Sequence, residues 1–193
     1  MNTYLSSSLT FYSDKITTKL QETFGDMEIP VMMDWEDSLM SASAAYVTQN
    51  GGDILEIGFG MGISAGYMHS HSINSHTIVE NHPEIIPKAI EWASNKSNVT
   101  IVSQSWYDVR NSLGTYDGIF YDTYGDDNAN QFSSSLSNWT KSGTKVTWWQ
   151  VRSNNKSNYH NIQNVTYKSI NVSPPSNTYF TGSTIYYLPM KEF

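Results

Sequence analysis

The sequence predicts an α/β protein with a Rossmann-like, doubly wound and mostly parallel sheet. Apolar runs alternate with helical patterns over residues 53–150, the order expected of strand–helix–strand units with right-handed crossovers. The run Asp53–Ile57 ends at three glycines spaced by two, and the next apolar run ends at the acidic residue Glu80. A glycine turn after one strand and an acid at the end of the next are typical of a fold that binds a nucleoside at the carboxyl edge of its sheet.

Two helices are predicted before the first strand. Apolar side chains lie four apart within residues 13–24, and residues 35–48 carry a similar apolar stripe. We therefore expect residues 1–50 to form a helical cap over the site. At 193 residues the chain has the length of one domain, so residues 1–193 are expected to form a single domain.

The elements of the sheet follow from short apolar runs separated by turn residues. The run at 53–57 fits a strand buried on both faces, and the glycines after it lead into a helix. The later elements are expected to be helices over 61–70, 83–94 and near 128–140, strands over 76–80, 98–102, 116–121 and 144–150, and a loop with Trp106 and Asp108. Residues 163–190 are rich in Thr, Tyr and Val and predict two further strands, which would form an antiparallel pair at the edge of the sheet.

The composition argues against several classes of protein. The chain has 11 basic and 18 acidic residues, and its net charge of −7 gives no electrostatic support to nucleic-acid binding. Without cysteine there is no disulfide or thiolate site, and the five scattered histidines predict no metal site. No apolar run approaches the roughly 20 residues of a membrane span, and no signal-peptide pattern is present. We expect a cytoplasmic monomer or homodimer that binds neither nucleic acid nor membranes.

The glycine motif indicates the class of nucleoside ligand. Gly58, Gly60 and Gly62 follow the spacing G-x-G-x-G, whereas a dinucleotide fingerprint has G-x-G-x-x-G. With Glu56 two residues before the first glycine, the segment looks like the first motif of class I S-adenosylmethionine methyltransferases. The alternative is an ordinary strand-to-helix turn, in which the glycines only relieve backbone strain.

Four separated segments make this resemblance more specific. They are Val31–Glu36, Leu55–Gly62, Trp106–Val109 and Tyr116–Tyr124. In order and spacing they resemble guanidinoacetate N-methyltransferase and the related fungal arginine N-methyltransferases, whose motifs read V-M-x-x-W-E, L-E-[IV]-G-F-G-M, G-L-W-x-D-V and F-D-G-I-x-Y-D-T-Y. The resemblance covers residues 28–150. It implies a class I methyltransferase fold and S-adenosylmethionine as the cofactor, with S-adenosylhomocysteine as the product.

The resemblance also implies roles for individual residues. It places the cofactor against Met32, Glu56, Gly58, Gly60, Met61, Glu80, Ser105, Trp106 and Asp122, with Glu80 at the ribose hydroxyls. It assigns substrate binding to Glu36, Asp122, Thr123 and Arg152, and catalysis to Asp122 and Glu36. Structural alternatives exist for three of these residues: a solvated charge near a helix start for Glu36, a helix cap for Asp122, and a core position for Trp106.

The chemistry of a guanidinium explains why two carboxylates belong in such a site. A guanidinium is planar and carries several donors, which carboxylates accept in a two-pronged geometry. Its pKa is about 12.5–13.8, so at neutral pH it is a cation and a poor nucleophile. Attack on a sulfonium methyl group therefore needs a carboxylate that accepts a proton as the new bond forms.

The chain departs from the family pattern at the substrate end of the site. Where the family has H-T-H-Q-F after Y-D-T-Y, this chain has two acids, Asp126 and Asp127. Where the family binds the substrate carboxylate through L-T-S, this chain has Arg152, which either binds that carboxylate or neutralises one of the two acids. The leading hypothesis is a methyltransferase of a small guanidino compound, guanidinoacetate first. The alternatives are methylation of another amine or of a protein arginine, and a nucleoside-binding protein without catalysis.

Overall fold

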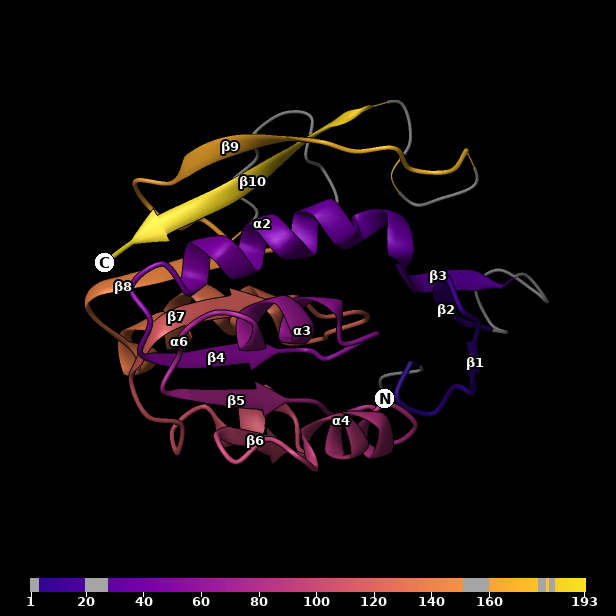
Figure 1. Ribbon diagram of the computed structural model, residues 1–193, viewed down its shortest axis with the longest axis horizontal. Helices are drawn as coiled ribbons and strands as arrows, with labels where there is room; N and C mark the ends of the chain where they lie inside the picture. Colours follow the sequence, from indigo (N-terminus) through magenta and orange to yellow (C-terminus); the bar gives the residue numbers. More distant parts are fainter. Residues whose placement is uncertain (1–3, 20–27, 151–159, 177–179, 181–182) are drawn as a thin grey trace.

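The computed structural model describes residues 4–19, 28–150, 160–176, 180 and 183–193. Its centre is a sheet of seven strands: β4 (Asp53–Ile57), β5 (Ser75–Val79), β6 (Val99–Val102), β7 (Tyr116–Tyr121), β8 (Thr140–Trp148), β9 (Thr166–Asn171) and β10 (Ile185–Glu192). Their spatial order is β6-β5-β4-β7-β8-β10-β9 (Figure 1). The chain builds outward from β4 in both directions, which is the predicted doubly wound arrangement.

The direction of the strands also agrees with the sequence analysis. Strands β4 to β8 pair in parallel with one another. Strand β10 pairs antiparallel with both β8 and β9. The predicted antiparallel pair near the C-terminus is therefore confirmed. The last strand lies inside the sheet, between β8 and β9, and β9 forms the edge.

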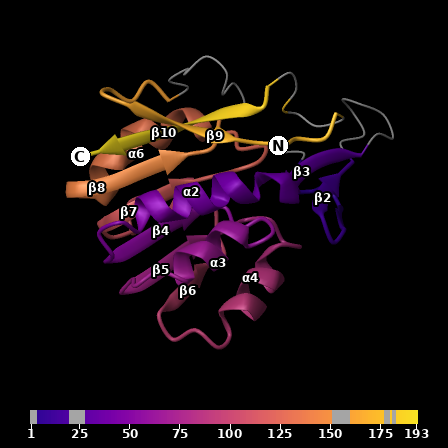
Figure 2. The ribbon, with the colours of Figure 1, turned by 45° about the horizontal axis from the view of Figure 1, so that its top comes forward.

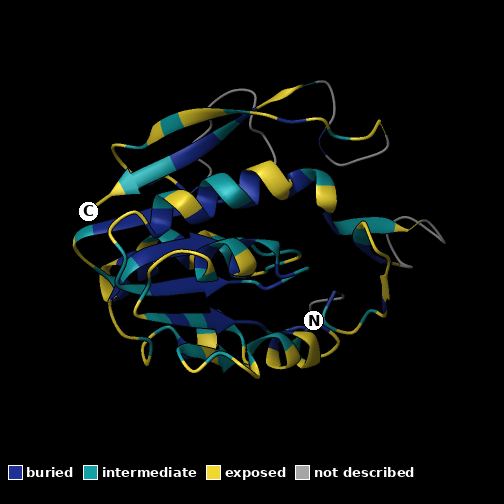
Figure 3. Ribbon diagram, in the orientation of Figure 1, coloured by how far each residue is buried: buried dark blue, intermediate teal, exposed yellow. Residues whose placement is uncertain are grey.

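Helices cover both faces of the sheet (Figure 2). They are α2 (Asp37–Val47), α3 (Ile63–His69), α4 (Ile86–Ala93), α5 (Trp106–Val109) and α6 (Phe132–Trp139). Neighbouring strand residues point to opposite faces, so Ile54 packs with α2 and α3, whereas Leu55 packs with α5 and α6. Strands β4 and β7 are consequently buried on both sides (Figure 3). The expected loop with Trp106 and Asp108 contains the single-turn helix α5.

The predicted helix over residues 13–24 is wrong. Its described part belongs to a small antiparallel sheet of β1 (Leu9–Phe11), β2 (Lys15–Thr18) and β3 (Ile29–Met33). Strand β2 pairs with both β1 and β3, which buries the β-branched residues Ile16, Thr17 and Thr18. The helical spacing of apolar residues is therefore overridden by pairing with two strands. The expected cap contains this sheet as well as the second predicted helix, which is confirmed as α2.

The N-terminal segment, which carries β1, β2 and β3, lies at the carboxyl edge of the seven-stranded sheet. The arrowheads of β4 and β5 point toward the N-terminal residues and β3 (Figure 1). From β3 the chain passes through a 3₁₀ turn, η1 (Asp34–Glu36), into α2.

None of the helices in the described ranges combines the length and the hydropathy that crossing a bilayer requires. The expected cytoplasmic location and single-domain organisation stay predictions.

Candidate functional site

A cavity of about 440 Å³ lies at the carboxyl edge of the sheet, between the loops that follow the strands and the N-terminal segment. The predicted site residues that line it are Met32, Glu36, Gly58, Gly60, Glu80, Trp106, Asp122 and Thr123. Among the described residues, Glu56, Met61 and Ser105 do not belong to the lining, although Ser105 lies between two residues that do. Arg152 lies outside the described residues. One cavity thus brings together residues from segments that are far apart in the sequence.

The glycine turn after β4 allows neighbouring segments to approach its backbone. Gly58 has a φ of +92°, and a Cβ there would lie 1.8 Å from the backbone oxygen of Asp122. Gly60 has a φ of +54°, and a Cβ there would lie 2.5 Å from Sδ of Met32. A side chain at either position would therefore strain the backbone and displace its neighbour. Both glycines are required by the packing of the protein itself, in addition to any ligand.

Glu80 is fixed by backbone donors just after β5. Its carboxylate accepts hydrogen bonds from the amide of Phe59 at 2.9 Å and from the amides of Asn81 and His82 at 2.8 Å each. The residue is only 6% exposed and lines the cavity. Three donors on one carboxylate fix its orientation, as the recognition of two adjacent hydroxyl groups requires.

Glu36 and Asp122 reach the cavity from different parts of the chain. Glu36 ends η1, is 3% exposed, and accepts a hydrogen bond from the amide of Met33 at 3.1 Å. Asp122 follows β7 directly. Burial raises the pKa of Asp122 well above its ordinary value, and the negative charges of three glutamates raise it further, in the order Glu36, Glu56 and Glu80. A carboxyl group in this environment is suited to pair with a cation and to accept a proton.

Glu56 lies behind the cavity wall. It is fully buried in β4, where Ser64 donates a hydrogen bond to one carboxylate oxygen and Nε2 of His76 lies 2.9 Å from the other. Ser64 is in the first turn of α3 and lines the cavity. Glu56 therefore does not line the cavity itself but binds Ser64, which does. Met61 similarly lies behind Met32, whose Sδ accepts a hydrogen bond from the Met61 amide at 3.1 Å.

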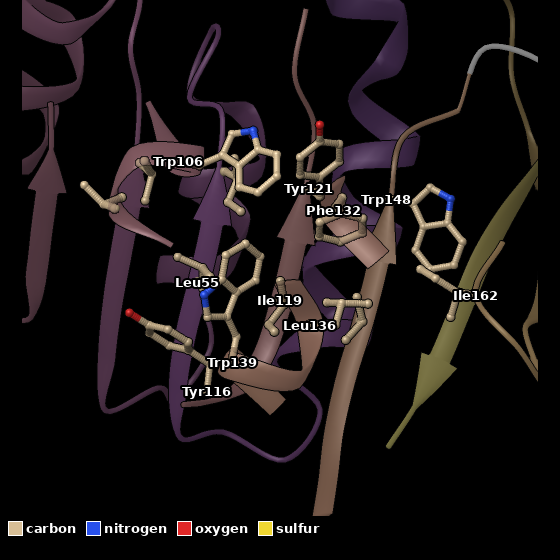
Figure 4. Packing of buried hydrophobic residues seen from close by; sticks show 14 residues of the cluster. Leu55, Trp106, Tyr116, Ile119, Tyr121, Phe132, Leu136, Trp139, Trp148 and Ile162 are labelled. Atoms are coloured by element: carbon tan, nitrogen blue, oxygen red, sulfur yellow. The ribbon is translucent and has the colours of Figure 1, made fainter. Parts of the chain in front are cut away.

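Asp126 connects Trp106, which lines the cavity, with Tyr121 at the end of β7. Its Oδ2 accepts hydrogen bonds from Nε1 of Trp106 and from the hydroxyl of Tyr121, both at 2.6 Å. Trp106 and Tyr121 belong to an aromatic cluster with Phe132, Trp139 and Trp148. Figure 4 shows the indole nitrogen of Trp106 and the hydroxyl of Tyr121 at the same end of this cluster. Trp106 also packs edge-to-face on Tyr121 and Trp139, with ring centroids 5.8 Å apart in both pairs. Trp106 is therefore both a core residue and part of the cavity wall.

The lining also contains residues to which the sequence analysis assigned no site role, among them Tyr4, Asp126 and Trp149. Tyr4 reaches the cavity through distant contacts, since its carbonyl oxygen lies 3.2 Å from Nε2 of His82 and its ring lies 4.8 Å from that of Tyr124. No local pattern indicates such contacts. For Asp126 the departure from the family motif was a usable signal, because an acid stands where the family has other residues.

The sequence matches a known family. The family model described as guanidinoacetate N-methyltransferase matches residues 12–164. Protein arginine N-methyltransferase 2 from Kluyveromyces lactis is 35% identical over 133 residues, covering 63% of this chain and 31% of that protein. The protein of the same name from Saccharomyces cerevisiae is 33% identical over 132 residues, covering 63% of this chain and 31% of that protein. The chain thus spans about three tenths of the length of these curated relatives.

Solved structures show the same fold at low sequence identity. Spermidine synthase from Thermotoga maritima matches with a TM-score of 0.62 and 9% identity, covering 96% of this chain and 71% of that one. Precorrin-6y C5,15-methyltransferase from Geobacter metallireducens matches with a TM-score of 0.55 and 14% identity, covering 79% and 86%. These similarities establish the fold class that the sequence predicted.

Asp122→Asn is expected to stabilise the ligand-free protein at neutral pH. The pKa of Asp122 is raised in the folded state, so its contribution to stability is present below the ordinary value of 3.8 and is lost as the pH rises through the folded pKa. Asparagine carries no charge and avoids that loss. At pH 7 the variant should unfold at a higher temperature, by about 2–4 °C for each kcal/mol in a domain of this size, and the difference should disappear near pH ~3.

The matched control is Asp127→Asn, because Asp127 is exposed and does not line the cavity. Thermal unfolding followed by circular dichroism should give the wild-type midpoint for this control. An Asp122→Asn midpoint at or below that of the wild type at pH 7 would contradict the unfavourable charge at Asp122.

Proposed function

Because the chain belongs to the guanidinoacetate N-methyltransferase family, we propose that it transfers a methyl group from S-adenosylmethionine to a nitrogen of a guanidino group. The observation that carries this proposal is the pair Glu36 and Asp122, which face one cavity together with the glycine turn after β4. A protein that only bound a nucleoside would need neither carboxylate at that position.

The charge of the cavity supports the proposed cofactor. Its acidic lining residues are Glu36, Glu80, Asp122 and Asp126, and none of the described lining residues is Lys, Arg or His. Such a lining favours positively charged ligands. When bound, S-adenosylmethionine supplies a methyl group that is electrophilic because it is attached to a sulfonium cation. Glu80 would hold the ribose hydroxyls, and Gly58 and Gly60 would adjoin the methionine portion.

Glu36 and Asp122 would orient the acceptor and remove its proton. Two-pronged hydrogen bonds from the guanidinium to carboxylates fix the plane of the acceptor. A bound cation lowers the pKa of Asp122, opposing the effects of burial and neighbouring acids, and so favours the ionised form that can act as a base. As the new N–C bond forms and the S–C bond breaks, Asp122 accepts the proton that the nitrogen loses. The hydrogen bond from the amide of Met33 keeps the orientation of Glu36.

A second class of acceptor is the arginine side chain of a protein. Two observations favour it: the curated relatives are named protein arginine N-methyltransferase 2, and the described lining offers no basic group for a substrate carboxylate. Arg152 is the candidate from the sequence for binding such a carboxylate, as guanidinoacetate would require. Both acceptors present the same guanidino group, so the proposed chemistry is shared, and a carboxylate bound by Arg152 would favour guanidinoacetate.

Replacing Glu80 tests the proposed cofactor site. Glu80→Ala should weaken S-adenosylhomocysteine binding by about 1.5–3 kcal/mol, the range for hydrogen bonds to a charged group. Isothermal titration calorimetry measures this change. Glu91→Ala, which removes an exposed acid of α4, should bind like the wild type. Equal affinities of all three proteins would exclude Glu80 from ribose recognition.

Asp122→Asn tests the proposed chemistry, because it keeps the shape of the side chain but removes the base. Methyl transfer to a guanidino substrate should fall by at least about 10²-fold, while the affinity for S-adenosylhomocysteine stays nearly unchanged. Asp127→Asn serves again as the control and should keep wild-type turnover. Near-normal turnover of Asp122→Asn would show that Asp122 has only a structural role.

The acceptor class is tested by comparing guanidinoacetate, a carboxylate-free alkylguanidine and an arginine-containing peptide. If Arg152 binds a carboxylate, the wild type should prefer guanidinoacetate and Arg152→Ala should lose most of that preference. Steady-state kcat/KM values for the three acceptors decide the question. The same order of acceptors in both proteins would exclude Arg152 from acceptor recognition, and a peptide preferred in both would favour the protein arginine.

A further inference from the structure

Among the described acids that line the cavity, Asp126 is the one to which the proposed reaction gives no role. Its Oδ2 accepts the hydrogen bonds from Trp106 and Tyr121 at 2.6 Å, and its Oδ1 accepts one from the amide of Asn128 at 2.8 Å. The hydroxyl of Thr123 lies at 3.4 Å from Oδ2, which is long for a hydrogen bond between oxygens. A carboxylate has about four acceptor positions. Among the described residues, Trp106, Tyr121 and Asn128 donate at normal hydrogen-bond distances and fill three of these positions. One acceptor position therefore remains, on Oδ1.

The contacts of Asp126 place this lining residue at one end of the cavity. Its partner Trp106 begins α5, the helix that follows β6. In the sheet, β6 lies beyond β5, and the loop after β5 carries Glu80, the proposed ribose ligand. Glu36 and Asp122, the proposed acceptor ligands, come from η1 and from the end of β7 on the opposite side of β4. A nucleoside whose ribose lies at Glu80 would therefore extend its base toward Trp106 and Asp126.

The two donors on Oδ2 also restrict how the carboxylate can turn. The indole N–H and the phenol O–H approach from the same end of the aromatic cluster (Figure 4). Trp106 is 3% exposed and Tyr121 is 3% exposed, so both donors are held by packing. A carboxylate fixed in this way offers an acceptor in one direction, which is what selective recognition of a ligand group requires.

We propose that Asp126 accepts a hydrogen bond from the 6-amino group of the adenine and thereby selects adenine against 6-oxopurines. This inference rests on the proposed cofactor. The exocyclic amino group is a donor, whereas the ring nitrogens of adenine and the 6-oxygen of a 6-oxopurine are acceptors. A carboxylate only accepts, so at the position of the 6-substituent it pairs with the amino group and is repelled by the 6-oxygen, whereas the N1–H donor of a 6-oxopurine lies at a different ring position. A site built around a polar group discriminates strongly against an analogue that leaves that group unpaired.

Replacing Asp126 by asparagine would present a donor to the ligand in place of an acceptor, which can be tested. The amide oxygen of the new side chain can take over the hydrogen bonds from Trp106 and Tyr121, and its amide nitrogen then occupies the place of Oδ1, where it can no longer accept the hydrogen bond from the amide of Asn128. That nitrogen is a donor, which suits a 6-oxygen and not a 6-amino group. A purely structural role of Asp126 would instead change the binding of every purine nucleoside to the same extent.

The experiment measures the affinities of S-adenosylhomocysteine and S-inosylhomocysteine, its 6-oxo analogue, by calorimetry. The wild type should bind the adenosyl ligand at least about tenfold more tightly, which corresponds to about 1.4 kcal/mol. In Asp126→Asn this ratio should fall to about threefold or less, or should reverse. The matched control Asp127→Asn, which removes an exposed acid outside the cavity lining, should retain the wild-type preference.

Each outcome decides one point. Equal binding of the two ligands by the wild type would overturn the proposed role of Asp126 without any variant. A preference that survives in Asp126→Asn, with both ligands weakened equally, would show that Asp126 only positions Trp106 and Tyr121. If Asp126→Asn weakens a guanidino acceptor and leaves the purine preference unchanged, Asp126 belongs to the acceptor end. If the wild type binds neither nucleoside, the proposed cofactor itself is wrong, and this result is distinct from the others.

Discussion

The contact between the turn after β4 and the end of β7 is the constraint on which the site depends. Only glycine at position 58 lets the backbone oxygen of Asp122 approach so closely, and the same approach places the side chain of Asp122 beside the turn. The two strands are parallel neighbours, so their carboxyl ends meet at one edge of the sheet. The segments that carry the proposed cofactor and acceptor ligands are therefore adjacent, as methyl transfer between two bound molecules requires.

Clustered negative charge is the second property of the site. Three of the carboxyl groups accept hydrogen bonds from the protein: Glu80 from three backbone amides, Glu56 from Ser64, and Glu36 from the amide of Met33. At Asp122, burial and the neighbouring acids raise the pKa. A sulfonium and a guanidinium would together relieve this repulsion. The same clustered charge would make the site selective for cationic ligands.

The N-terminal segment completes the cavity from outside the sheet. Strand β3 brings Met32 against Gly60, and η1 then places Glu36 at the cavity just before α2 begins. Tyr4 closes another part of the lining through its contacts with His82 and Tyr124. The doubly wound sheet therefore supplies the turn, Glu80 and Asp122, whereas the segment before it supplies one of the two carboxylates proposed for the acceptor.

Local patterns in the sequence were enough to predict the parallel sheet, the limits of β4 and β7, the glycine turn and the acids near strand ends, because these depend on apolar runs and spacings within a few residues of each other. The strand at residues 15–18 could not be predicted in this way, because its pairing with β1 and β3 outweighs a helical spacing. Long-range packing also fixes the insertion of β10, the position of Tyr4, and the hydrogen bonds of Asp126 with Trp106 and Tyr121. Many of these contacts join residues that are distant in sequence, and their energies depend on a packing that no local pattern records.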